Sequence, residues 1–109
     1  MAKAYLGEFE HLVLLAMLRL DKAAYAPAIL AELEQRTGRP PSAGSVYVTL
    51  DRLEDKGLIR SWIADETTER GGRPRRYVSV TPRGLRELRA SRNALLALWT
   101  DLEGLLEGT

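Results

Sequence analysis

The apolar residues in the first twenty positions of the chain are spaced as in an amphipathic helix. Most are separated by three or four positions, the repeat that places side chains on one face of a helix. They are Phe9, Leu12, Val13, Leu15, Ala16 and Leu18. The spacing predicts a first helix over residues 7–20 that ends at Asp21, with these side chains on its apolar face.

Two further helices are predicted before any strand. Residues 23–37 resume the helical period, with Pro27 in the first turn and Gly38 directly after the end, positions at which these two residues are favoured. Ser42 then follows a rigid Arg-Pro-Pro link and is suited to cap a third helix that stops at Gly57. The predicted buried stripe of this third helix is Val46, Thr49, Leu50 and Leu53.

The pattern changes from helical to extended after Gly57. Residues 58–64 and 75–81 are short segments with β-branched and aromatic side chains, and a polar, glycine-containing segment separates them. They predict a two-stranded hairpin with a long tip. Trp62 on the first strand is expected to pack across to the second strand.

After Pro82, the chain predicts one long helix over residues 83–106. Its apolar seam alternates steps of three and four, a heptad pattern, and a helix of about 24 residues is about 36 Å long. That length exceeds the core that so short a chain builds, so we expect the seam to pack against a second copy. The predicted dimerisation residues are Leu88, Leu95, Trp99, Leu102 and Leu106.

Composition limits the chain to one small globular domain. It has 109 residues, of which 45% are hydrophobic and 28% charged, enough apolar material for a single core. The chain has no cysteine, which removes disulfides and thiolate sites and fits a reducing cytoplasm. The longest apolar run, residues 12–18, is too short to cross a bilayer. We therefore expect a cytoplasmic protein without a membrane segment.

Positive charge is concentrated in one window of a nearly neutral chain. Residues 70–92 hold eight arginines and a single acid, a net charge of +7 within a total of +1. Such asymmetry predicts a polyanionic partner at one end of the fold. Four of these arginines, Arg70, Arg73, Arg75 and Arg76, surround a glycine pair at the hairpin tip. They suit phosphate contacts; protection of the hairpin against aggregation is the alternative.

Three helices followed by a hairpin is the element order of a winged helix-turn-helix, in which the third helix enters the major groove of DNA. Opposite the buried stripe, this helix presents small residues at its N-terminal end, which allow close approach to base edges, and Arg52 further on. A merely solvated helix face is the alternative. The predicted DNA-binding residues are Ser42, Gly44, Ser45, Tyr47, Val48, Arg52, Arg70, Arg73, Arg75 and Arg76.

Catalysis is not supported by the residues present. The chain has one histidine, His11, and no cysteine, so it offers neither a nucleophile with a base nor ligands at metal spacing. The acids Asp51, Glu54 and Asp55 are expected to pair with Arg52 or Lys56 and to be solvated. We predict no catalytic residue, metal or cofactor. A winged-helix module for protein–protein contacts, without specific DNA binding, is the rival hypothesis.

Three segments resemble the PadR family of bacterial transcriptional regulators. They are "LGEFEHLVLLAML", "GSVYVTLDRLEDKGLI" and "GGRPRRYVSVTPRG". The resemblance implies a mainly α fold with a small β-hairpin, in which residues 1–82 form a winged helix-turn-helix DNA-binding domain and residues 83–109 a long C-terminal dimerisation helix. It also implies a repressor that binds a palindromic operator in double-stranded DNA as a homodimer.

The chain departs from the family pattern at two places. Where the family commonly begins the second helix with Tyr-Gly-Tyr-Glu, this chain has Tyr25 followed by Ala-Pro-Ala, and the usual proline after the tyrosine of the third helix is Val48. Val48 belongs to the helix surface that is expected to face the groove. The operator sequences of the family therefore do not predict the operator of this chain.

The resemblance also implies a candidate site for a small aromatic effector. Some relatives that respond to drugs stack flat ligands on a tryptophan of the last helix, and Trp99 is the matching residue here, with Phe9 and Tyr5 as candidate neighbours. Ordinary packing of the Trp99 indole on the heptad seam is the more common role and stays open.

Overall fold

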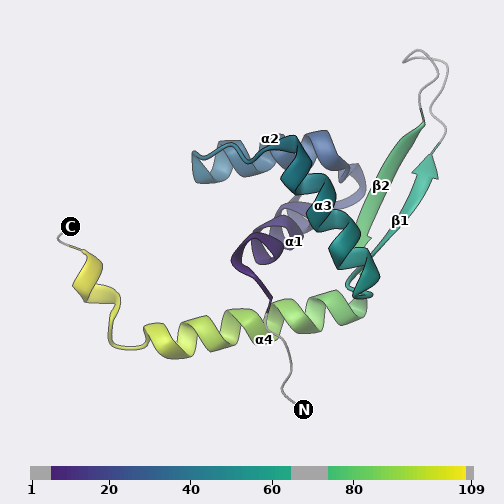
Figure 1. Cartoon of the computed structure of the whole chain (residues 1–109). Helices are drawn as coiled ribbons and strands as arrows, with labels where there is room; N and C mark the ends of the chain where they lie inside the picture. Colours follow the sequence, from purple (N-terminus) through teal and green to yellow (C-terminus); the bar gives the residue numbers. More distant parts are fainter. Residues whose placement is uncertain (1–5, 65–73, 108–109) are drawn as a thin grey trace.

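The computed structural model describes residues 6–64 and 74–107. Three helices pack together, an antiparallel hairpin follows, and a longer helix runs along one side of this unit (Figure 1). The elements are α1 (Glu8–Leu20), the 3₁₀ helix η1 (Asp21–Ala23), α2 (Ala26–Thr37), α3 (Ala43–Asp55), β1 (Ile59–Ala64), β2 (Arg75–Val80), α4 (Pro82–Trp99) and the 3₁₀ helix η2 (Glu103–Leu106). The predicted mainly helical fold with a small hairpin is confirmed.

Local signals in the sequence set the helix ends. The Ser42 hydroxyl accepts a hydrogen bond from the Ser45 backbone N–H at 3.1 Å, so the predicted cap of α3 is confirmed. Gly38 ends α2 with a φ of 74°, a left-handed conformation that glycine adopts without strain. Thr81 caps α4 in the same way as Ser42, by accepting from the Gly84 N–H at 3.0 Å.

The core forms between α1, α2, α3 and the inner face of the hairpin. The predicted stripe of α3 is buried throughout. On α1, however, Leu14 and Met17 are buried while Leu15 and Leu18 are 42% and 44% exposed, so the predicted apolar face of this helix was partly wrong. The reason is that α1 packs on α2, α3 and β2 with one side, and its second apolar stripe faces away from that core.

The hairpin is held to the helices by its inner face and by one edge. Ile59 pairs with Val80 and Trp62 with Tyr77 across the two strands. The Trp62 and Tyr77 rings stack with their centroids 6.1 Å apart, which confirms the predicted cross-strand packing. At the free edge of β2, the Val78 N–H donates to the Ala24 carbonyl at 3.0 Å and thereby fixes the hairpin next to the start of α2.

The last helix is shorter than predicted. It ends at Trp99 rather than at residue 106, because Thr100 turns extended and Asp101 takes a φ of 68°. The Thr100 backbone N–H and hydroxyl both bond the Leu96 carbonyl and so close the last turn. Leu102 and Leu106 therefore lie beyond the helix, and the predicted continuous heptad seam is wrong at its end.

The first half of α4 belongs to the core of its own chain. Leu88 is only 6% exposed, so its predicted place on a dimer seam is wrong. Gly84 lies so close to β1 that a side chain there would overlap the Leu58 carbonyl oxygen, and only glycine permits this crossing. Residues 92–99 are by contrast all exposed, and Figure 1 shows this half of α4 extending past the other helices.

Candidate nucleic-acid interface

The outer face of α3 is an exposed surface with little bulk at its N-terminal end. Gly44 and Arg52 are exposed, and Val48 keeps 55% of its surface accessible although it is apolar. The core does not need this valine, because the buried stripe lies on the opposite side of the helix. The structure thus brings the predicted residues of α3 together on one face, beside the hairpin (Figure 1).

The first turn of α3 is fixed by two hydrogen bonds between the same two serines. Besides the cap, the Ser45 hydroxyl donates to the Ser42 carbonyl at 2.8 Å. Both side chains are therefore oriented before any ligand binds. Each hydroxyl oxygen retains the capacity to accept a further hydrogen bond.

Tyr47 and Arg75 border a cavity of about 350 Å³ between α2, α3 and β2. The guanidinium carbon of Arg75 lies 4.6 Å from the ring centroid of Tyr25, a cation–π distance, and Tyr25 immediately precedes α2. A guanidinium, two tyrosines and a helix N-terminus together suit an anion such as a DNA phosphate.

Tyr25 is a residue of this surface that the sequence interpretation did not select. In the sequence, Tyr25 was noted only as the first residue of the Tyr-Ala-Pro-Ala segment, which departs from the family pattern. Its closeness to Arg75 and Tyr77, whose ring centroid is 5.7 Å away, comes from the attachment of β2 to Ala24. No local pattern in the sequence shows that contact.

Arg76, next to Arg75 on the same strand, has entirely different partners. It donates to Asp51 at 3.1 Å and to Glu54 at 2.7 Å, and Glu54 also accepts from the Ser61 hydroxyl. These hydrogen bonds from Ser61 and Arg76 hold the pKa of Glu54 below its usual value. The expected pairing of Asp51 and Glu54 with Arg52 or Lys56 is therefore wrong. Arg70 and Arg73, also predicted to contact DNA, lie outside the described residues.

A second ion pair fastens the end of α3 to the start of α1. Lys56 Nζ donates to Glu10 at 2.7 Å, and the other Glu10 oxygen accepts from the Gly7 N–H at 3.0 Å. Burial alone would raise the pKa of Glu10, but the Lys56 and Gly7 hydrogen bonds and the nearby positive charges hold it below 4.5. The carboxylate thus satisfies a helix N-terminus and positions the last turn of α3.

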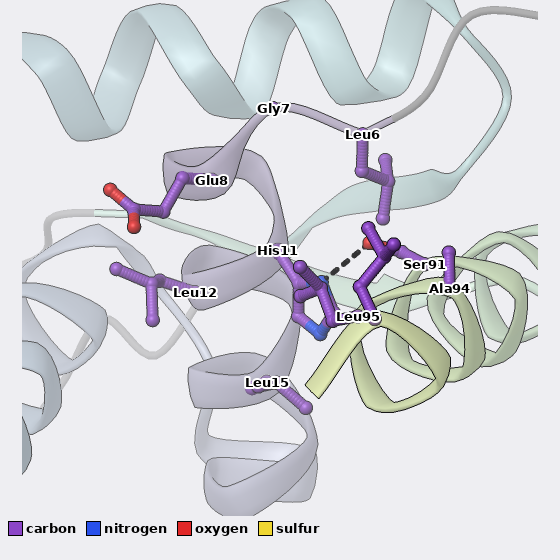
Figure 2. Close-up of a pocket in the computed structure, with 10 residues that line it drawn as sticks. Leu6, Gly7, Glu8, His11, Leu12, Leu15, Ser91, Ala94 and Leu95 are labelled. Atoms are coloured by element: carbon purple, nitrogen blue, oxygen red, sulfur yellow. Dashed lines mark hydrogen bonds between the residues drawn. The ribbon is translucent and has the colours of Figure 1, made fainter. Parts of the chain in front are cut away.

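A groove between α1 and α4 forms an apolar surface of the described chain. It encloses about 630 Å³ and is lined mainly by leucines, among them Leu12, Leu15, Leu95 and Leu98. Figure 2 shows His11 of α1 and Ser91 of α4 facing each other across it, hydrogen-bonded through Nδ1 and Oγ at 2.8 Å. Burial lowers the pKa of His11, which favours the neutral imidazole in this apolar setting.

The groove continues into exposed apolar residues near the end of the chain. Leu98 is 75% exposed, while Leu95 and Trp99, two of the predicted dimerisation residues, are 52% and 40% exposed. The predicted Leu102 and Leu106 are exposed as well, beyond the helix end. The sequence interpretation did not place Leu15 and Leu98 on an exposed apolar surface. It assigned a single apolar stripe to each helix.

The three candidate effector residues are not brought together in a described cavity. Phe9 packs against the core, and neither it nor Trp99 lines the groove between α1 and α4. Tyr5 lies outside the described residues. An aromatic effector at Trp99 stays a prediction.

Residues 6–64 and 74–107 contain neither a metal-binding cluster nor a membrane-spanning helix. No group of three acidic or histidine side chains is arranged there to hold a metal ion. None of the helices in these ranges combines the length and the apolar character needed to cross a bilayer.

A family model and a solved structure both relate this chain to the same family of transcriptional regulators. The model of the transcriptional regulator PadR-like family matches residues 14–90. The solved structure of a PadR family transcriptional regulator from Eggerthella lenta is 31% identical, with a TM-score of 0.71 over 94% of this chain and 88% of that one. A PadR-like transcriptional regulator from Bacillus cereus is 23% identical, with a TM-score of 0.73 over 93% of each chain. No protein with a curated description matches.

The Glu10–Lys56 pair predicts an acid-sensitive contribution to stability. Because the pKa of Glu10 is lower in the folded chain than the ordinary 4.5, its stabilising effect is complete above about pH 4.5 and is lost as the pH falls through the folded pKa. Glu10→Gln should lower the free energy of unfolding by about 1–3 kcal/mol at pH 7. The gap from the unsubstituted protein should narrow below pH 4.5.

Urea unfolding from pH 3 to pH 7 measures this difference. Glu34→Gln, at an exposed position of α2, is the matched control and should leave both the stability and its pH dependence unchanged. A constant gap between Glu10→Gln and the unsubstituted protein over the whole range would contradict the assignment.

Proposed function

The chain belongs to the PadR-like family of transcriptional regulators, and from this premise we propose that it binds a specific operator in double-stranded DNA through α3 and the hairpin, as a homodimeric repressor. The observation that carries the proposal is the outer face of α3. It is exposed, small at its N-terminal end and fixed by the Ser42 cap. Such a face suits the major groove, where base edges are read at close range.

The residues of this surface divide into those that read bases and those that bind the backbone. Gly44, Ser45 and Val48 approach base edges, and Arg52, further along the same exposed side, reaches a base edge or a phosphate. Ser42 binds the backbone at the start of α3, and Tyr47 binds it beside the cavity that it shares with Arg75 and Tyr25. Arg75 and Tyr25, with the predicted Arg70 and Arg73 at the tip, bind it on the hairpin side.

The homodimer is supported by the apolar surface of α1 and α4. Soluble monomers rarely expose contiguous apolar patches larger than a few hundred Å². Three of the groove leucines, Leu15, Leu95 and Leu98, are nevertheless exposed here, together with Leu96 and Trp99. A second copy that covers the same surface in return forms a two-fold interface. Two copies related in this way read a palindrome, and occupation of promoter DNA by the dimer would repress transcription.

Arg75 should contribute to DNA affinity without contributing to sequence choice. If its guanidinium binds a phosphate, Arg75→Gln should weaken binding to all sequences by a similar factor. It should also reduce the slope of log K against log salt concentration by about 0.9 per half-site. Fluorescence anisotropy between 50 and 300 mM salt measures both quantities.

The control is Arg36→Gln, which removes the same charge from the far end of α2, where Arg36 pairs with Glu32 at 2.9 Å. This variant should keep the original slope. An unchanged slope in Arg75→Gln would show that Arg75 is not part of the DNA interface. Absence of DNA binding at low salt would instead favour a winged-helix module for protein–protein contacts.

Leu98 should be required for the dimer and not for the fold. Its side chain is 75% exposed in the single chain, so Leu98→Glu costs the monomer little, whereas a carboxylate buried in the dimer costs several kcal/mol. Sedimentation at micromolar concentration should show a dimer for the unsubstituted protein and a monomer for the variant, with operator affinity reduced at least tenfold.

Ile63→Glu provides the control for this test. Ile63 is similarly exposed, at 66%, but it lies on β1, away from α1 and α4. This variant should remain dimeric. A monomeric unsubstituted protein, or a dimeric Leu98→Glu variant, would refute the proposed interface.

A further inference from the structure

The helix that we place in the major groove carries more negative than positive charge. Among its residues, Asp51, Glu54 and Asp55 are acidic and only Arg52 is basic. Asp51 lies seven positions after Gly44 and three positions after Val48. This spacing puts all three residues on the same side of the helix. A carboxylate on this face points toward the DNA, where the phosphates repel it unless it is neutralised and has a partner there.

Arg76 neutralises two of these carboxylates from the hairpin. Its Nη1 donates to Asp51 Oδ1 at 3.1 Å and its Nη2 to Glu54 Oε1 at 2.7 Å. Arg76 is paired with Ile63 across the two strands, and Ser61 is two positions from Ile63 on β1. Because paired residues, and residues two apart on a strand, share a face, Arg76 and Ser61 lie on the same face of the hairpin. The Ser61 hydroxyl is 3.0 and 2.8 Å from the two Glu54 oxygens. Glu54 is thus engaged on both oxygens by the hairpin.

Asp51 is held in a different way. Only its Oδ1 is bonded to Arg76, and the side chain remains 70% exposed, against 39% for Glu54. Asp51 itself lies on the outer side of α3, three positions after Val48. The carboxylate is therefore oriented, partly neutralised and still able to accept a hydrogen bond from a ligand on that side.

We propose that Asp51, held by Arg76, is a specificity-determining residue that accepts a hydrogen bond from the exocyclic amino group of a cytosine or an adenine in the major groove. This inference rests on the proposed DNA-binding function. In the major groove only cytosine N4 and adenine N6 offer such donors, while guanine and thymine present acceptors that a carboxylate repels. Arg76 acts on DNA through Asp51 and is a positioning residue, not a phosphate anchor.

Selection of binding sites from a randomised DNA pool tests the proposal. The unsubstituted protein should favour an amino-bearing base at one position of each half-site by about tenfold or more. Asp51→Ala should reduce this discrimination to less than about twofold, while the other positions keep their preferences. Alanine is the strongest helix former, so the variant retains α3.

Asp55→Ala is the matched control. It removes the same charge from an exposed position four residues further along α3, where no contact with Arg76 is made. Both alanine variants should gain similar non-specific affinity, but Asp55→Ala should keep every base preference. Unchanged discrimination in Asp51→Ala, or an equal loss in Asp55→Ala, would overturn the assignment of Asp51.

Arg76→Gln tests the positioning role separately. This variant should lose base discrimination at the same position as Asp51→Ala, and it should bind DNA more weakly. In the double variant, Asp51→Ala should raise the DNA affinity by a larger factor than it does in the unsubstituted protein. That non-additivity is the signature of two residues acting together. Additive effects with the preference retained would make Arg76 a phosphate anchor and overturn its positioning role.

If the unsubstituted protein selects no sequence from the pool, the proposed function itself fails. If it selects a clear half-site and Asp51→Ala selects the identical one with equal discrimination, only the role of Asp51 is refuted.

Discussion

The burial of one side of α1 is the constraint on which the rest of the structure depends. Val13 and Leu14 are fully buried, and α1 contacts α2, α3, α4 and β2. Because α2, α3 and β2 pack on one side of this 13-residue helix, α3 is packed by its inner stripe and its outer face stays free. For the same reason the second apolar stripe of α1, with Leu15, remains open beside α4. Both proposed interfaces are therefore surfaces that the core leaves uncovered.

The alternation of a β-strand separates two arginines that look equivalent in the sequence. Successive side chains of a strand point to opposite faces, so Arg75 lies over Tyr25 while Arg76 reaches back to Asp51 and Glu54. Arg75 thus contacts an aromatic ring next to α2, whereas Arg76 pairs with two carboxylates of α3. The concentration of arginine in this window therefore serves two purposes, of which the count of charges predicts only one.

Sequence periodicity predicted what depends on neighbours in the chain. The buried stripe of α3, the Ser42 cap and the cross-strand position of Trp62 are local and were predicted correctly. The end of α4 was not, because steps of three and four continue in the sequence past Asp101, where the backbone turns out of the helix. The partners of Arg76 and the place of Tyr25 depend on how the hairpin docks, and spacing carries no information on that.

In the proposed complex, two copies of the α3 face bind DNA together. Hydroxyl-radical footprinting with the purified protein, on the DNA upstream of its own gene, tests it most directly. We expect two protected half-sites related by a palindrome, with centres about 10 base pairs, or a multiple of one helical turn, apart. Protection of a single half-site, or of no sequence in particular at low salt, would contradict it.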